Sequence, residues 1–270
     1  MTEQATAPAK AGRLADRIRV IDMGEPFVWL GKGWNDLCRS PRMSLAHGVI
    51  FTVTGLGLSV GLRLAGMDYL IYPLTAAFLI GGPFLAFGLY DISRKYEAGL
   101  LPRPGKCLTA GRHNTYHILT AGLVLMLFAI IWSRFAVLTF ALSFPHVGGS
   151  LETVIDRILF TMDGWIFLAT GTFIGGILAG IAFLFGVITL PMMLDRKVDV
   201  FAAAGVSFMV IAKNKGAMLT WAGLIVIFTG AGLATAYIGL AVTLPLIGHA
   251  SWHAYRACVD AEAWPKTPEG

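Results

Sequence analysis

Charge and cysteine are both scarce in this chain. Aspartate, glutamate, lysine and arginine together make up 14% of its 270 residues, roughly half of the share found in soluble domains. Apolar residues reach 56%. A folded protein of this size cannot bury so many apolar side chains away from water, which excludes a soluble enzyme. A chain so rich in apolar residues is not disordered either. The three cysteines form no C-x-x-C pair, which excludes a disulfide-stapled secreted domain and predicts reduced thiols.

Sequence motifs for catalysis and nucleotide binding are also missing. The chain contains neither the P-loop pattern G-x-x-x-x-G-K-[ST] nor the zinc pattern H-E-x-x-H. Each of these patterns places a reactive or phosphate-binding group in a defined turn or helix. We therefore expect a protein that is not an enzyme and that carries no cofactor.

Apolar residues fill five long stretches instead. A helix of about 20 such residues spans the core of a bilayer. Four stretches have the length of one crossing each: residues 44–65, 69–91, 114–141 and 165–192. The fifth, 216–256, is about twice as long as one crossing and is predicted to form two helices that turn near Gly230–Gly232. The sequence thus predicts an all-α, polytopic membrane bundle of six transmembrane helices.

Basic residues are distributed unevenly around these stretches. Eighteen of the 21 lysines and arginines flank them on one side, and only Arg63, Arg134 and Arg157 fall on the other. Since cytoplasmic loops retain basic residues, we predict a multi-pass protein of the inner membrane with both termini in the cytoplasm. The expected division is a cytoplasmic segment over 1–43, a membrane domain over 44–256 and a cytoplasmic tail over 257–270. The formal net charge of +5 points to anionic lipid headgroups, and not nucleic acid, as the charged partner.

Three shorter segments have the pattern of helices that lie on the membrane surface. Residues 14–39 mix arginines with Trp29 and Trp34, residues 151–162 place apolar and charged side chains on opposite faces, and 198–212 is apolar but too short to cross. We predict interfacial helices at the first two and an interfacial or re-entrant helix at the third. Asp199 is expected to cap the last of them.

Two helix ends resemble each other closely enough to suggest a parallel internal repeat. Counted from a proline, an aromatic residue follows at +7 and an arginine at +11: Pro83, Tyr90 and Arg94 in one, and Pro245, Trp252 and Arg256 in the other. A third helix ends at Pro191, followed by Asp195 and Arg196, and we expect Asp195 to pair with Arg196 or Lys197. Recurrence of such residues at any cytoplasmic helix end is the alternative explanation.

Three segments carry a resemblance to a known family. They are PFVWLGKGWNDLCRSPRMSLAHG at 26–48, LPMMLDRKVDVFAAAGVSF at 190–208 and LPLIGHASWHAYRACV at 244–259. The chain resembles, over roughly 26–260, a bacterial family of predicted integral membrane proteins with a domain of unknown function. The resemblance implies no reaction, although some relatives are labelled as candidate cytochrome c oxidase subunits. The chain lacks the span number and histidine motif of a haem-copper catalytic subunit, so only an accessory role is compatible with that label.

Histidines form two pairs with i,i+4 spacing, His113 with His117 and His249 with His253. This spacing puts both rings on one helix face, as in helical metal sites. A metal or haem site where spans 3 and 6 meet is one interpretation, and polar helix-end residues satisfied by water are the other. Without a set of inward carboxylates, we expect no metal. We predict that His249 and His253 face span 3 near Tyr116 or His117.

The sequence leaves three functions open. The first is a non-enzymatic membrane protein that accompanies a respiratory or other membrane complex, with further membrane subunits as partners. The second is a small-molecule or lipid transporter with a site near Pro83, Pro191 and Pro245. The third is a redox protein that uses the histidine pairs. At the end of the last helix, Trp252 and Tyr255 are expected at headgroup depth, with Arg256 on lipid phosphates or on the carbonyls that end the helix.

Overall fold

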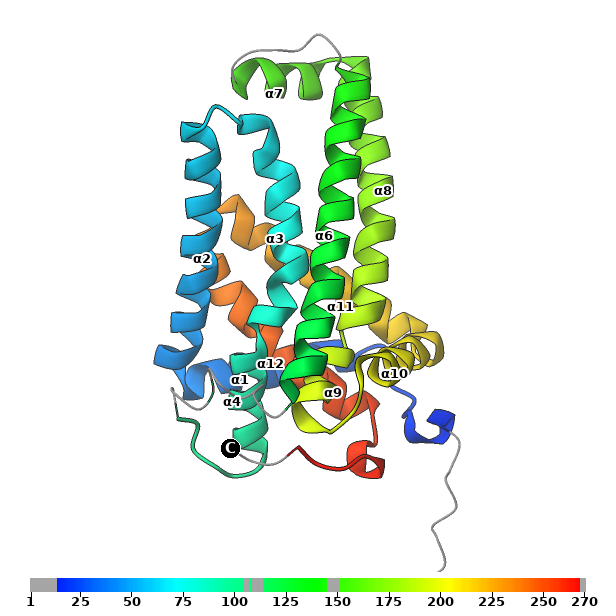
Figure 1. Cartoon of the computed structure of the whole chain (residues 1–270). Coiled ribbons are helices and arrows are strands. Elements are labelled where there is room, and N and C mark those ends of the chain that lie inside the picture. The colour runs from blue at the N-terminus through cyan, green and yellow to red at the C-terminus, as the bar shows by residue number, and fades with distance from the viewer. Residues whose placement is uncertain (1–13, 104–106, 108–113, 145–150, 268–270) are drawn as a thin grey trace, which may run out of the picture.

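Helices make up nearly all of the computed structural model, which describes residues 14–103, 107, 114–144 and 151–267 (Figure 1). Over these residues the only strand-like pairings are two isolated bridges. The α-helices are α1 Glu25–Arg39, α2 Pro41–Leu64, α3 Ile71–Leu85, α4 Phe87–Glu97, α6 Thr115–Ser143, α7 Leu151–Phe160, α8 Met162–Gly186, α9 Thr189–Asp195, α10 Val200–Lys213, α11 Lys215–Ala234 and α12 Leu240–Cys258. Short 3-10 turns are η1 Leu14–Arg17, η2 Asp68–Leu70 and η4 Ala261–Ala263.

Five helical stretches of the described residues are long and apolar enough to cross a membrane. They are Pro41–Leu64, Asp68–Glu97, Thr115–Ser143, Met162–Asp195 and Lys215–Ala234. The first four match the predicted crossings, and α2, α3, α6 and α8 rise side by side between two ends of the molecule (Figure 1). We call the end that holds η1, α1, α4, α9 and the C-terminal residues the basal end, and the end that holds η2 and α7 the distal end.

Prolines divide two of these long stretches near the basal end. Pro83 lies inside α3, which stops at Leu85 before α4 begins. Pro191 lies in the first turns of α9, just after the break that ends α8. A proline has no N–H to donate and its ring crowds the preceding turn, so it interrupts a helix. The short helices α4 and α9 can therefore leave the direction of the long ones and pack against each other.

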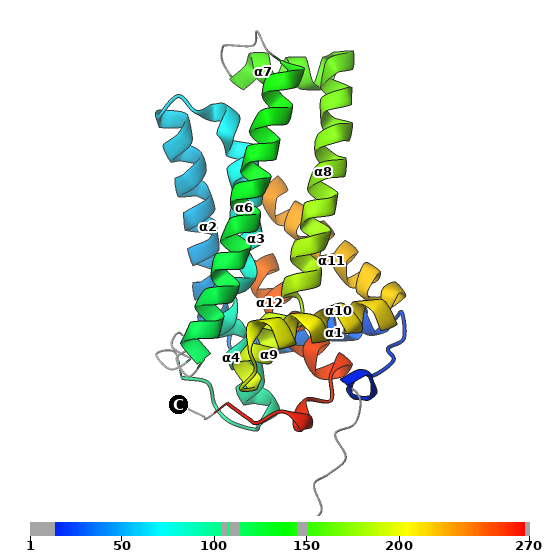
Figure 2. The ribbon, with the colours of Figure 1, turned by 45° about the vertical axis from the view of Figure 1, so that its right-hand side comes forward.

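The hairpin of α11 and α12 differs from the predicted last two crossings. Its turn spans Thr235–Gly239 and not Gly230–Gly232, which lies within α11. The turn lies beside the middle of α2, because the Tyr237 hydroxyl bonds to Ser59 at 2.9 Å and to Thr75 at 2.6 Å. The hairpin thus reaches only part of the height of the long helices (Figure 2). A sixth crossing is not confirmed, since α12 is not among the five stretches.

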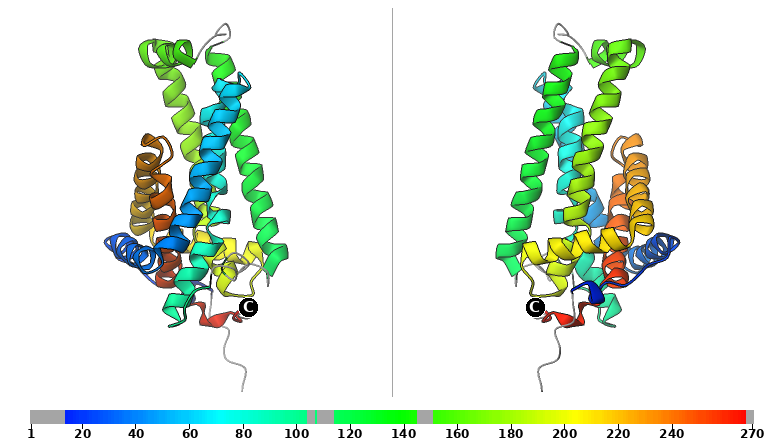
Figure 3. Two further views of the ribbon diagram at one scale, coloured as in Figure 1. Left: turned by 90° about the vertical axis from the view of Figure 1, so that its left-hand side faces the viewer. Right: turned by 90° about the vertical axis from the view of Figure 1, so that its right-hand side faces the viewer.

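The most fully buried part of the molecule lies at the basal end. The hairpin packs against α2 through α12, and α6 packs against α3 on the other side of the molecule (Figure 3). Buried there are Trp29 of α1, whose ring meets Trp221 of α11 edge to face at 5.9 Å, and the whole of Leu190–Leu194. The three segments that carry the family resemblance therefore meet in one core, to which α1, α9, α10 and α12 contribute together with α4, α6 and α11, and against which Met43 of α2 packs.

Several local predictions for the helices agree with the structure, and one for a tryptophan does not. Asp199 caps α10, accepting hydrogen bonds from the amides of Phe201 and Ala202 at 3.0 and 2.9 Å. Helices also form over the other two segments predicted to be interfacial. The expectation of Trp29 at the membrane surface is wrong, because its side chain is fully buried within the protein, whereas Trp34 is exposed.

Gly48 of α2 offers a test of the contact between α2 and the hairpin. A Cβ at Gly48 would lie 1.9 Å from the carbonyl oxygen of Ala241, whereas a Cβ at Gly57 of the same helix would meet nothing within 4 Å. Because backbone cannot yield as a side chain can, we predict that Gly48→Ala lowers the free energy of unfolding by about 3 kcal/mol or more. Gly57→Ala should be neutral or stabilising by up to about 1 kcal/mol, since alanine is the better helix former. Equal effects of the two substitutions, measured by reversible unfolding in detergent, would contradict this packing.

Candidate functional site at the basal end

Two polar assemblies lie side by side at the basal end. We call the first, made of Asp36, Ser44, Ser93, His249 and His253, the histidine cluster. We call the second the carboxylate cluster, which comprises Glu97, Asp195, Arg196, Trp252, Tyr255 and Arg256. Both draw on α12, and together they join it to α1, α2, α4 and α9.

The histidine cluster holds α12 through both rings of the i,i+4 pair. His249 is fully buried, with Nε2 2.9 Å from the Ser44 hydroxyl of α2 and Nδ1 2.8 Å from the Ser93 hydroxyl of α4. A neutral imidazole donates through one nitrogen and accepts at the other, so both hydroxyl bonds can form without a buried charge. His253 lies one turn further along, with Nε2 2.8 Å from Oδ2 of Asp36 in α1.

Asp36 is the charged member of this cluster. Burial acts to raise the pKa of its carboxyl, but the hydrogen bonds with His253 and Ser93 and the charge of His253 act against burial and hold the pKa below its ordinary value. The carboxylate therefore stays ionised next to His253 and completes an ion pair when that ring is protonated. Asp36 thus fixes α1 against the end of α12.

Three of the four histidines that were candidates for a metal site, His117, His249 and His253, lie within the described residues. His249 and His253 face α2, α4 and α1, so the prediction that they face span 3 is wrong. His117 contacts the ring of Tyr116 on its own helix at 5.1 Å, and His113 lies outside the described residues. Metal coordination by His249 would require one of its two serine bonds to break. No group of three or more metal-binding side chains occurs within the part of the chain that the structure describes.

His47 is a buried ring with one satisfied nitrogen. Its Nδ1 lies 2.9 Å from the carbonyl oxygen of Met43, which can only accept, so Nδ1 carries the proton. The other nitrogen, Nε2, is buried and has no hydrogen-bond partner among the described residues. A Cβ at Gly88 would lie 2.2 Å from this atom, so glycine is needed for α4 to pass the ring.

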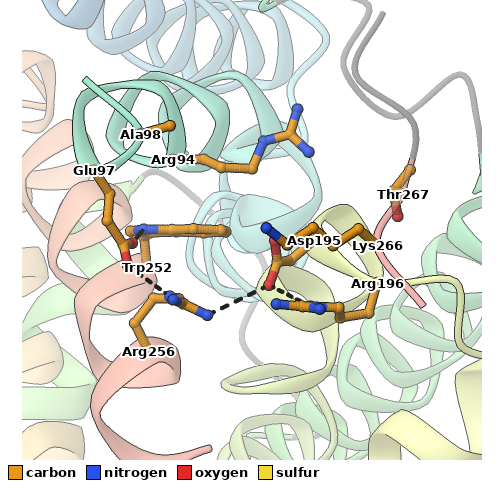
Figure 4. Close-up of a pocket in the computed structure, with 9 residues that line it drawn as sticks. All are labelled: Arg94, Glu97, Ala98, Asp195, Arg196, Trp252, Arg256, Lys266 and Thr267. Atoms are coloured by element: carbon orange, nitrogen blue, oxygen red, sulfur yellow. Dashed lines mark hydrogen bonds and ion pairs between the residues drawn. The ribbon is translucent and has the colours of Figure 1, made fainter. Parts of the chain in front are cut away.

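In the carboxylate cluster, one oxygen of Asp195 contacts three neighbours, of which Figure 4 shows Arg196 and Arg256. Oδ2 accepts from Arg196 Nε at 2.9 Å and from the Tyr255 hydroxyl at 2.8 Å, and lies 3.6 Å from Arg256 Nη1. Of the two predicted partners of Asp195, Arg196 forms the ion pair, and Arg196 is itself nearly fully buried. The amide of Thr267 donates to the backbone carbonyl of Asp195 at 2.9 Å, which brings the C-terminal segment to the same place.

Glu97, at the end of α4, makes the matching contacts on the other side. Its Oε2 accepts from the Trp252 indole at 2.9 Å, and its Oε1 accepts from Arg256 Nε at 2.8 Å. These contacts correct the prediction for the end of the last helix. Trp252 and Tyr255 are buried in protein and do not lie among headgroups, and Arg256 is paired with carboxylates.

A pocket of about 240 Å³ opens between α4, α9, α12 and the C-terminal segment. Its charged lining consists of Arg94, Glu97, Asp195, Arg196, Arg256 and Lys266, and Ala98, Trp252 and Thr267 complete it (Figure 4). The arginines at the ends of α4, α9 and α12 thus meet in one place. These are the three helix ends whose prolines and arginines suggested a repeat.

Some members of the site could not be found by pattern. Asp36, Ser44, Ser93 and Glu97 carry no motif, and each lies more than 150 residues from its partner on α12. The one available signal was that each is a polar residue inside or beside an apolar helix. Such residues usually have a partner, but the sequence does not tell which one.

The residues Gly57-Leu-Ser59-Val-Gly61 match the letters G-x-S-x-G of a hydrolase nucleophile motif. That motif needs a strand followed by a sharp turn into a helix. Here the residues lie inside α2, and the Ser59 hydroxyl donates to Tyr237 at 2.9 Å. The serine therefore anchors the turn of the hairpin and has no nucleophile geometry.

Comparison with known proteins agrees with the helical architecture. The model of a family described as "Predicted integral membrane protein (DUF2189)" matches residues 71–195, from the start of α3 to the end of α9. The chain is a multi-pass integral membrane protein. No curated protein and no solved structure matches it. The matched region includes Arg94, Glu97 and Asp195 of the pocket, whereas α1, α11 and α12 lie beyond it, and the respiratory label finds no counterpart.

The pH dependence of stability tests the contact of Asp36 with His253. Since the pKa of Asp36 is lower in the folded protein, the stabilisation is complete above its ordinary value of 3.8 and is lost as the pH falls through the folded value. We predict that Asp36→Asn costs about 2 kcal/mol near pH 6, the worth of a charge-assisted hydrogen bond. The difference from the unsubstituted protein should begin to shrink below pH 3.8 and should be lost as the pH falls through the lower folded pKa, where the carboxyl of Asp36 becomes neutral.

Unfolding temperatures from pH 3 to pH 7 measure this difference, with the exposed Asp156→Asn of α7 as the control. A pH-independent difference for Asp36→Asn, or an equal one for the control, would contradict the ionised pair.

Proposed function

We propose that this protein is a non-enzymatic subunit of the bacterial inner membrane that associates through its long helices with other membrane-protein subunits. The observation that supports this is the contrast between its two ends. The basal end is tightly interlocked, whereas the long helices bury little of their surface within the chain: of the apolar window of α6, only 6% is buried.

Glycines on α8 indicate how another helix would approach. A Cβ at Gly175 would meet the ring of Trp132 on α6, but a Cβ at Gly171, Gly176 or Gly180 would meet nothing within 4 Å. In membranes, glycines four residues apart let two helix backbones come close enough for van der Waals packing. Gly176 and Gly180 have this spacing, and within the described residues no atom lies within 4 Å of a Cβ built at either.

The topology that we propose has both termini in the cytoplasm. It combines four complete crossings with α11 and α12 as a re-entrant hairpin that enters and leaves on the cytoplasmic side. Non-helical backbone at membrane depth is tolerated where protein covers it, and the carbonyl of Tyr237 in the turn accepts from the Thr52 hydroxyl at 3.1 Å. The excess of basic residues on the basal side supports a cytoplasmic basal end. This argument holds equally for four crossings with a re-entrant hairpin and for six crossings, because the same loops lie on the basal side in both.

The transporter and redox alternatives are less well supported. Pro191 and Pro245 are buried, and α4, α9 and α12 contact one another, which suits a site near the helix ends. The span interiors nevertheless contain few polar groups for a polar substrate. The redox alternative would use His249, whose ring nitrogens already bond to two serines.

Purification of the tagged full chain at native expression in a mild detergent tests the proposal. We expect the chain to retain a defined set of membrane proteins, and Gly176→Leu with Gly180→Leu to release them. As the control, Gly223→Leu changes an open glycine of α11 that has no glycine four residues away. Recovery of a lone monomer, or retention of the same proteins by the double variant, would contradict the proposal.

A further inference from the structure

The basal pocket has more positive than negative charge. Arg94, Arg196, Arg256 and Lys266 line it, against two carboxylates, Glu97 and Asp195. A third carboxylate, Asp91, forms ion pairs with Arg94 and with Lys95. The charges of Asp91 and Lys95 cancel, so counting both leaves the excess of positive over negative charge unchanged. The lining of the pocket therefore has an excess of two positive charges. Within a partly closed pocket such an excess attracts an anion and raises its local concentration.

Two neighbouring residues of the lining have unused hydrogen-bonding groups. Lys266 forms no ion pair with any described residue, and its side chain extends along the pocket (Figure 4). Thr267 is 5% exposed, and its hydroxyl has no hydrogen-bond partner within the described part of the chain. A buried hydroxyl without a partner costs about 1–3 kcal/mol, so a ligand that bonds to it recovers that cost.

The C-terminal segment is held so that both residues face the pocket. The amide of Lys197 donates to the carbonyl of Pro265 at 2.9 Å, and Arg196 and Lys266 form an isolated bridge. Arg196 also donates through Nη1 to the carbonyl of Trp264 at 2.9 Å. These contacts fix the backbone that carries Lys266 and Thr267, so the Lys266 side chain is the main part left to be ordered on binding.

We propose that this pocket binds a phosphate group in its dianionic form. A phosphomonoester carries a charge of about −1.5 to −2 at pH 7 and three acceptor oxygens, which matches the excess of two charges and the available donors. The arginines supply N–H groups in the planar arrangement that suits phosphate oxygens. A volume of 240 Å³ lies below the usual range for drug-sized ligands, so the group enters with few attached atoms.

The phosphate can come from a soluble phosphorylated molecule or from the headgroup of a phosphomonoester lipid. The pocket lies at the basal ends of two apolar stretches, Asp68–Glu97 and Met162–Asp195, and beside the end of α12. In the proposed topology this end of the stretches meets the phosphate layer of the cytoplasmic leaflet. The pocket would recognise the same phosphate group in both cases, so the experiment uses one soluble probe and one lipid probe.

Titration calorimetry on the purified full chain in a zwitterionic detergent provides the measurement. The probes are inorganic phosphate and a short-chain phosphatidic acid, with short-chain phosphatidylcholine as the headgroup control. We expect saturable binding of at least one of the first two. Phosphatidic acid that competes with phosphate indicates the lipid source, and phosphate alone indicates the soluble source.

Lys266→Gln and Thr267→Val remove the two unused groups and leave every ion pair of the cluster in place. Each should weaken binding about fivefold, the effect of one basic residue or one hydrogen bond. Lys32→Gln makes the same charge change on an exposed position of α1 and should leave affinity within about twofold. Absence of saturable binding, equal binding of phosphatidylcholine, or variants at 266 and 267 that bind like Lys32→Gln would each overturn the proposal.

Discussion

The carboxylate of Asp195 is the interaction on which the basal end depends. One of its oxygens contacts Arg196 of its own chain segment and Tyr255 and Arg256 of α12, and its backbone carbonyl holds Thr267. An ion this poorly exposed to water is stable only when opposite charges and donors surround it. The ends of α9 and α12 and the C-terminal segment are therefore fixed together, and Glu97 adds the end of α4 through Arg256.

This interlock explains why the two halves of the molecule differ so much. Polar contacts at the basal end set the positions of four helices, whereas the distal halves of α2, α6 and α8 have mainly apolar side chains to offer. Lipid tails are as apolar as these side chains, so burial provides no hydrophobic gain within the membrane and helices associate through close packing and hydrogen bonds. The hydroxyl contacts of Tyr237 with Ser59 and Thr75 are such bonds, and they fix the hairpin at mid-height.

Local features of the fold could be predicted from the sequence, and long-range features could not. The four long spans follow from apolar length alone, and the Asp199 cap and the Asp195–Arg196 pair follow from neighbours in sequence. A re-entrant hairpin and two crossings have the same hydropathy, so the position of the turn depends on contacts of Tyr237 that no local pattern shows. Tryptophan, tyrosine and arginine at a helix end are typical of a headgroup belt, yet Glu97, 155 residues away, draws Trp252 into the protein.

The free energy of unfolding of Asp195→Ala, measured in detergent against Glu262→Ala on the exposed turn η4, tests the interlock most directly. Removing Asp195 leaves the buried Arg196 without its counter-ion and Tyr255 without its acceptor. Loss of one partner from a buried ion pair typically costs 3–5 kcal/mol, so we predict a loss of about 4 kcal/mol for Asp195→Ala. The control should change by less than about 0.5 kcal/mol. A loss for Asp195→Ala as small as that of the control would show that the basal end is held together by other contacts.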